Sequence, residues 1–255
     1  MELFLELLRL GCFSYKDVVK LAGNKKTADS FLRRYKLKGL IVSVKKSLYT
    51  AISPETMAPA ATPFEIASRI TEHSYVSHHS AFTYYGMANQ VTTQMYVTSP
   101  NRFNNFEFNG TTYIYVRQTI DSGVVSPTPR VRITDLERTI LDSIKDFTKI
   151  GGLEELLRCL LMVTFVDKSK LLSYLPEYKN QFLYQKTGYI LSHYQKEMKL
   201  DRAFFDECRK NIGRSKRYLY PELKKDKKSS YSREWGLCVS ADLLKLVDEG
   251  GDEIV

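Results

Sequence analysis

KKTADSFLRRYKLKGLIVSVKKSLYTAI, residues 25–52, decides the fold predicted for the N-terminal part of the chain. Phe31, Leu32 and Tyr35 fall on one side of a helix predicted from about Lys26 to Lys38. Gly39 ends that helix, since glycine readily adopts the backbone conformation found just past a helix end. Two short strands follow, at residues 40–44 and 48–52, joined by a Lys-Lys-Ser turn.

The residues before this stretch predict two more helices. Apolar side chains at helical spacing indicate a first helix within residues 3–10, which Gly11 ends. Ser14 is suited to cap a second helix over residues 15–22, and Gly23-Asn24 is a tight-turn pair. Three helices followed by a basic β-hairpin within about fifty residues are typical of a winged helix-turn-helix.

Positive charge is concentrated in this segment. The chain of 255 residues has a net charge of +9, and residues 1–50 hold eleven Lys and Arg against four Asp and Glu. A second basic stretch covers residues 214–228, whereas the tail from Asp242 is acidic. Concentrated positive charge favours a polyanionic partner, most often nucleic acid.

The predicted third helix and hairpin supply the candidate DNA-binding side chains. Arginine and asparagine can read base edges with two hydrogen bonds, while lysines suit phosphates and make affinity depend on salt. The hairpin lysines would lie over the DNA backbone or minor groove. The candidates are Asn24, Lys25, Lys26, Thr27, Ser30, Arg33, Arg34, Lys36, Lys45 and Lys46.

The remainder reads as a linker and a mixed α/β domain with a helical end. Prolines mark residues 53–62 as a linker, and a capping box with proline opens a helix at Thr62. Asn109-Gly110 predicts a hairpin, Thr134–Glu137 a second capping box, and residues 214–231 a mobile loop. The predicted fold class is α+β, divided into residues 1–52, 53–62 and 63–255.

Other chemistry has little support in the sequence. The four cysteines are scattered, no nucleotide-binding or metalloprotease motif occurs, and no apolar run could span a membrane. We expect one histidine of the pair His78-His79 to cap a helix and the other to be exposed, and structural roles for Asp135, Glu137 and Asp142. Trp235 is expected to anchor a last strand. We predict no catalytic residue, metal, cofactor, small-molecule substrate or membrane partner, and a cytoplasmic protein.

Four stretches together resemble the AbiEi family of bacterial antitoxins. They are the predicted wing KGLIVSVKKSLYTAISPE (Lys38–Glu55), YVSHHSAFTYYGM (Tyr75–Met87), VRITDLERTILDSI (Val131–Ile144) and KTGYILSHY (Lys186–Tyr194). They follow one another with the family's spacing. The chain departs from the family pattern at Ser47, where a wing glycine is usual, at Lys186, where arginine is usual, and at Tyr85, where histidine is common.

The resemblance implies a winged-helix regulator that represses its own operon. It also implies a second domain that counteracts a nucleotidyltransferase-type toxin in phage defence. The partners expected on this basis are double-stranded operator DNA and a cognate toxin. This second activity follows from the resemblance alone, because a fold does not determine a function.

Two other hypotheses stay open at the level of sequence. The first is a metal-dependent nuclease guided by the winged helix, which would use clustered carboxylates. The second is an interaction module whose winged helix binds protein rather than DNA. Cleavage of plasmid DNA with magnesium, or capture of a protein partner without duplex binding, would separate these from a DNA-binding antitoxin.

Overall fold

The computed structural model describes residues 2–225 and 229–240, which form a mixed α+β protein as predicted. Two compact units are described separately below. The sheet unit comprises the described residues up to Ser77, Thr93–Gln118 and Val124–Ile133. The helical unit comprises His78–Thr92, Thr119–Gly123 and the described residues from Thr134 onward. The predicted three-part division at residues 52 and 62 stays a prediction.

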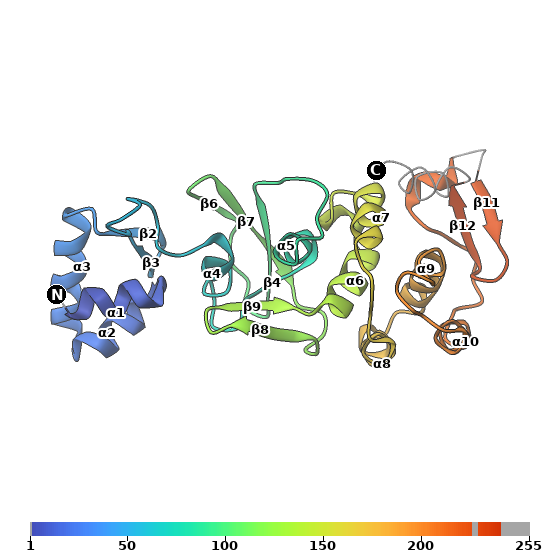
Figure 1. The fold of residues 1–255 in the computed structure, drawn as a ribbon, viewed down its shortest axis with the longest axis horizontal. Coiled ribbons are helices and arrows are strands. Elements are labelled where there is room, and N and C mark those ends of the chain that lie inside the picture. Colours follow the sequence, from blue (N-terminus) through green and yellow to red (C-terminus); the bar gives the residue numbers. More distant parts are fainter. Residues whose placement is uncertain (1, 226–228, 241–255) are drawn as a thin grey trace. The chain divides into compact units, whose positions relative to one another are not determined.

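The sheet unit begins with three helices and a small antiparallel sheet of strand order β1-β3-β2 (Figure 1). The elements in chain order are α1 (Glu2–Leu10), β1 (Cys12–Ser14), α2 (Tyr15–Ala22), α3 (Lys25–Leu37), β2 (Ile41–Lys45) and β3 (Leu48–Ala51). The helices and the strand pair match the prediction within one residue at most ends. Strand β1 was not predicted, because its three residues pair only with β3.

Local side-chain bonds explain where these helices begin. Ser14 and Asp17 form a capping box at α2, in which each side chain bonds the other residue's backbone N–H. Asn24 caps α3 by accepting a hydrogen bond from Thr27 N at 2.8 Å. Between them Gly23 has φ 80°, a left-handed conformation that glycine adopts without strain. The two helices are therefore separated by a turn that the sequence encodes locally.

A second, six-stranded sheet of order β6-β7-β5-β4-β9-β8 completes the sheet unit. Its elements are α4 (Pro63–Ala67), β4 (Tyr75–Val76), β5 (Gln94–Ser99), β6 (Phe106–Phe108), β7 (Thr111–Arg117), β8 (Val124–Thr128) and β9 (Val131–Thr134). The predicted capping box at Thr62 and Glu65 is present. The predicted hairpin is present as well, and Asn109 and Gly110 both have positive φ, as a type I′ turn requires.

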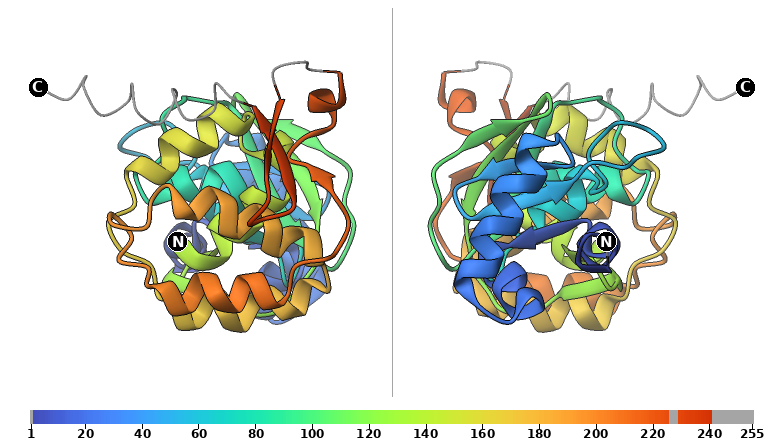
Figure 2. Two further views of the ribbon diagram at one scale, coloured as in Figure 1. Left: turned by 90° about the vertical axis from the view of Figure 1, so that its right-hand side faces the viewer. Right: turned by 90° about the vertical axis from the view of Figure 1, so that its left-hand side faces the viewer.

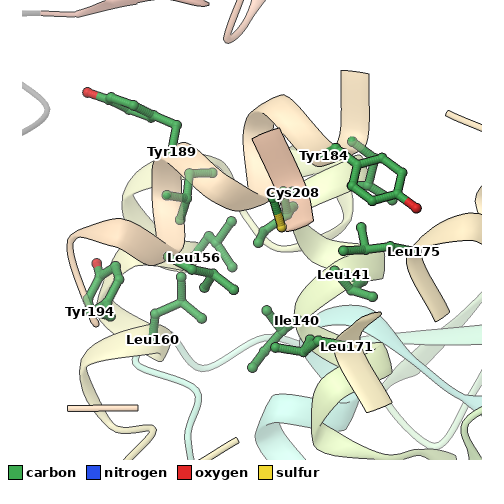
Figure 3. Close-up of a cluster of buried hydrophobic side chains, with 14 of the residues drawn as sticks. Ile140, Leu141, Leu156, Leu160, Leu171, Leu175, Tyr184, Tyr189, Tyr194 and Cys208 are labelled. Carbon is green, nitrogen blue, oxygen red and sulfur yellow. The ribbon is translucent and has the colours of Figure 1, made fainter. Parts of the chain in front are cut away.

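The helical unit packs its helices around one large apolar cluster. Its helical elements are α5 (His78–Tyr84), α6 (Leu136–Lys145), η1 (Phe147–Lys149), α7 (Leu153–Leu161), α8 (Lys168–Tyr174), η2 (Leu175–Tyr178), α9 (Gln181–Ser192), α10 (Arg202–Lys210) and η3 (Pro221–Lys224). Figure 3 shows leucine and isoleucine side chains from α6, α7 and α8 gathered in this cluster. Apolar burial of this size is the main stabilising term of the unit.

A third small sheet, of order β10-β12-β11, corrects the prediction of a mobile loop over the described part of residues 214–231, of which 226–228 lie outside the described residues. Its strands are β10 (Arg217–Tyr218), β11 (Ser229–Ser232) and β12 (Leu237–Ser240). The prediction was wrong because the segment is polar, while its pairing partner β12 lies later in the chain. Trp235 is buried beside Gly188 of α9, as predicted for an anchor.

The predicted capping box at Thr134 is wrong by one residue. Asp135 is the N-cap of α6, and its carboxylate accepts a hydrogen bond from Arg138 N at 2.9 Å. Glu137 instead accepts from the backbone N–H of Asp167 at 2.8 Å, a residue far away in the sequence. A long-range contact therefore replaced the local bond that the sequence pattern indicated. Within residues 2–225 and 229–240, no helix is long and apolar enough to cross a membrane.

Candidate nucleic-acid interface

The outward face of α3 carries most of the candidate side chains. Ala28, Phe31 and Leu32 are buried and fix which side of the helix packs against its unit. Positions on the opposite side follow at helical spacing and are exposed, namely Lys26, Ser30, Arg33 and Leu37. We define these four residues as the outward stripe. The right-hand view of Figure 2 shows α3, in blue, in front of the strands of its unit.

Nearly all the predicted contact residues are exposed. The exposed ones are Asn24, Lys25, Lys26, Thr27, Ser30, Arg33, Arg34, Lys36 and Lys46. Lys45 is half-buried. The cations therefore extend over the outward stripe and its two flanks rather than being hidden in the core.

Several of these side chains are held by neighbours. The Lys36 ammonium lies 4.5 Å from the centre of the Tyr49 ring, and the Arg34 guanidinium lies 5.2 Å from that of Tyr35. Asp29, the acid on this side of α3, accepts a hydrogen bond from the Tyr15 hydroxyl at 2.9 Å. That bond raises the pKa of Tyr15 and keeps the carboxylate of Asp29 close to α2.

A shallow hollow lies along the C-terminal half of α3. Its volume is about 450 Å³, and it is lined by Ser30, Arg33, Arg34, Leu37 and Lys38. Leu37, the last residue of α3, is 81% exposed. Two arginines and an apolar side chain on one helical surface can bond base edges and contact a thymine methyl group.

The two hairpin lysines differ although they are adjacent in the sequence. Lys46 is exposed, whereas the Lys45 ammonium lies 5.2 Å and 5.6 Å from the rings of Phe103 and Phe106. It also lies 3.4 Å from Ile70 O, and burial lowers the pKa of Lys45. The turn residue Ser47 has φ 63°, a left-handed conformation that glycine adopts more readily than serine.

A cleft of about 700 Å³ beside the hairpin turn contains cations that the sequence did not indicate. Arg69, Arg130 and Arg132 line it together with Lys16 and Lys46. Arg69 forms an ion pair with Asp17 at 2.6 Å, and Arg130 with Glu65 at 2.8 Å. Arg69 lies far from Arg130 and Arg132 in the sequence and meets them only in the folded sheet unit, so no local pattern could have identified the group.

The histidine pair is buried, contrary to the expectation that one member is exposed. His79 Nε2 lies 3.2 Å from Glu155 Oε1, and the same carboxylate accepts hydrogen bonds at 2.9 Å from the backbone N–H groups of Asn89 and Gln90. Burial lowers the pKa of His78 to about 4, so this imidazole is neutral at pH 7. The prediction failed because Glu155 is 76 residues from His79.

The acidic residues around α6 form a buried network. Arg138 Nε bonds Asp142 Oδ2 at 3.3 Å, as its spacing predicts, and also bonds the carbonyl of Ser122. Asp142 accepts a hydrogen bond from Tyr178, and Asp135 one from Tyr174, each at 2.8 Å. Within the part of the chain that the structure describes, no group of three metal-ligating side chains occurs. These carboxylates are therefore engaged in packing contacts of the helical unit.

The described residues form a mixed α+β fold with two three-stranded sheets and one six-stranded sheet. No family model and no curated protein sequence matches it. Among solved structures, the chain is similar to the crystal structure of the RV2827C protein from Mycobacterium tuberculosis, with a TM-score of 0.60 and 13% sequence identity. The match covers 94% of this chain and 90% of that one, and at this identity it describes the fold alone.

Proposed function

We propose that residues 1–52 are a winged helix-turn-helix that binds double-stranded DNA through α3. The observation that carries the proposal is the outward stripe, where Lys26 and Arg33 are exposed on the side of α3 opposite its packed face. The element order supports it, since two further helices precede α3 and the β2–β3 hairpin follows it. A helix of this kind fits the major groove, and its arginine can bond a guanine with two hydrogen bonds.

The remaining cations suit contacts with phosphates. Lys25 and Lys26 are at the start of α3, and Lys46 is at the exposed hairpin turn. Phosphate contacts release counterions, so the affinity should fall steeply as salt rises. A helix N-terminus also favours anions, which places the first turn of α3 among the expected contacts.

We further propose that the protein is a cytoplasmic antitoxin that represses its own operon. The support is the resemblance of four stretches to the AbiEi family, which implies a cognate nucleotidyltransferase-type toxin as partner. In this proposal the chain acts by binding, and it has no catalytic residue of its own. The toxin half is tested by expressing the neighbouring gene with and without this protein. Growth arrest that this protein relieves would support it, and an absent or harmless neighbour would contradict it.

The DNA half is tested by fluorescence anisotropy on a duplex from the region upstream of the gene. We expect Arg33→Ala to weaken binding by about fivefold to a hundredfold, because a base contact contributes about 1–3 kcal/mol, and Lys26→Ala to weaken binding and lower the salt slope by about one. The matched control is the double variant Lys196→Ala/Arg202→Ala, which removes two exposed cations of the helical unit. It should bind like the parent protein.

Two outcomes would contradict the DNA proposal. The first is an absence of duplex binding at low salt by the folded parent protein. The second is an equal loss of affinity in the Lys26/Arg33 variants and the control, because only general electrostatic attraction would then be at work. Tight binding of a protein partner through the same stripe would favour the interaction-module hypothesis instead.

A further inference from the structure

A cavity of about 630 Å³ lies in the helical unit, within the size range of small-molecule sites. Apolar side chains make up most of its wall, and they come from η1, the start of α7 and residues 219–221, which lead into η3. The residues that matter here are Phe147, Leu153, Lys186, Leu219, Tyr220 and Pro221. None of the predicted contact residues lines it, so this cavity is separate from the proposed DNA-binding surface.

Lys186 is a buried cation in the wall of this cavity. Only 8% of the residue is exposed. Its ammonium lies 3.4 Å from Ile144 O and 3.5 Å from Lys145 O at the end of α6, and 4.1 Å from the centre of the Phe147 ring. Among residues 2–225 and 229–240, no carboxylate oxygen lies within 4.0 Å of it. Asp146 acts on Lys186 from beyond that distance and already pairs with Lys149, so an anion in direct contact would further reduce the cost of burying the ammonium.

The other charged groups of the cavity wall already have partners or face solvent. Asp146 accepts hydrogen bonds from Thr148 and pairs with Lys149. Glu154 pairs with Arg158 at 3.1 Å, and Glu222 is exposed. Lys145, which also lines the cavity, donates to Thr119 Oγ1 at 3.2 Å.

Lys186 is mainly protonated at neutral pH despite its burial. Burial lowers its pKa to about 8, and the charge of Asp146 acts in the opposite direction. At pH 7 the cavity wall therefore holds the Lys186 ammonium beside the apolar side chains of Phe147, Leu153 and Leu219 and the charged groups described above.

We propose that this cavity binds a small molecule with an apolar body and one carboxylate, the carboxylate pairing with the Lys186 ammonium. The apolar body would pack against Phe147, Leu153 and Leu219, and the carboxylate would supply a counter-charge in direct contact with the ammonium. Binding requires both the protonated lysine and the ionised carboxylate, so affinity should be highest at about pH 6–7 and fall as the pH rises through about 8. The proposal does not depend on the DNA-binding function.

The test is isothermal titration with 4-phenylbutyrate and with the uncharged 4-phenylbutanol, which has the same apolar body. We expect the acid to bind at least tenfold more tightly than the alcohol at pH 7. Lys186→Met should remove that preference, because methionine keeps the length of the side chain without its charge. The control Lys196→Met changes an exposed lysine of the same unit and should bind like the parent protein.

Three results would overturn the proposal. They are equal affinity for acid and alcohol, unchanged acid binding by folded Lys186→Met, and no saturable binding of the acid at millimolar concentration. Circular dichroism shows whether Lys186→Met is folded. If Lys186→Met is not folded, acid binding by the parent protein is measured from pH 7 to pH 10. Binding that stays constant over this range would also contradict a role for the ammonium.

Discussion

Helices α3 and α6 carry similar charged residues and use them in opposite ways. On α3 the cations Lys26 and Arg33 are exposed along the outward stripe. On α6 Arg138 and Asp142 are buried and bonded to each other. The comparison shows that charged residues on a predicted helix do not by themselves indicate whether that helix binds a partner. Whether the charge binds a partner or stabilises the fold depends on residues that reach the helix from elsewhere in the chain.

Replacing Arg138 should produce the largest effect. Arg138→Met leaves the buried carboxylate of Asp142 with the Tyr178 hydroxyl but without its cation. Breaking a buried ion pair in this way costs about 3–5 kcal/mol. Urea unfolding followed by circular dichroism measures the change. Arg33→Met is the matched variant on α3 and should stay within about 0.5 kcal/mol of the parent. Equal costs for the two variants would remove the distinction between the helices.

Glu155 gives a medium effect with a defined pH dependence. Hydrogen bonds from Gln90 N, Asn89 N, Cys159 and His79 outweigh its burial and lower the pKa of Glu155. Because the pKa of Glu155 is lower in the folded protein than the value near 4.3 in the unfolded chain, the ionised carboxylate stabilises the fold above about pH 4.3. This stabilisation is lost as the pH falls through the folded-state pKa.

Glu155→Gln should therefore be less stable than the parent by about 1.5–3 kcal/mol at pH 7. The gap should narrow as the pH falls from about 6 to 3, and thermal melts at several pH values measure it. If the difference in unfolding free energy between the parent and Glu155→Gln grew toward low pH, the ionised carboxylate of Glu155 could not be what stabilises the parent.

Substitutions of the two adjacent hairpin lysines should have the smallest effects, and each lysine serves as a control for the other. Lys46→Ala should lower the slope of log affinity for DNA against log salt by about one, if Lys46 contacts a phosphate. It should not change unfolding. Lys45→Met should instead lower the unfolding free energy by about 0.5–1 kcal/mol, because its ammonium lies against Phe103 and Phe106. Equal salt slopes for the two variants would show that Lys45 also reaches the DNA.

The sequence predicted those parts of the fold that local chemistry determines. The start of α2 at Ser14, the Asn109-Gly110 turn and the bond between Arg138 and Asp142 all depend on residues within four positions of each other. Helix α3 was predicted from its apolar spacing. Its outward stripe could be predicted for the same reason, since the packed face of a helix fixes the opposite one.

Long-range pairing accounts for what could not be predicted. Strand β10 pairs in parallel with β12, with Arg217 opposite Leu237, and β1 pairs with a strand more than thirty residues later. The histidine pair is buried because Glu155 reaches His79 from another helix. The cavity around Lys186 is likewise assembled from segments distant in the sequence. Periodicity and caps carry no information on such contacts.

The contact between Trp235 and Gly188 determines how far the chain can be shortened. A Cβ on Gly188 would lie 2.0 Å from the indole, so the ring rests directly on the helix backbone. Ending the chain before residue 235 would expose the backbone of α9 at Gly188 and the apolar side chains around it to solvent. Exposed apolar surface of this kind promotes self-association. Shortened versions prepared for crystallisation should therefore retain residues through 240, or insoluble protein is the expected product.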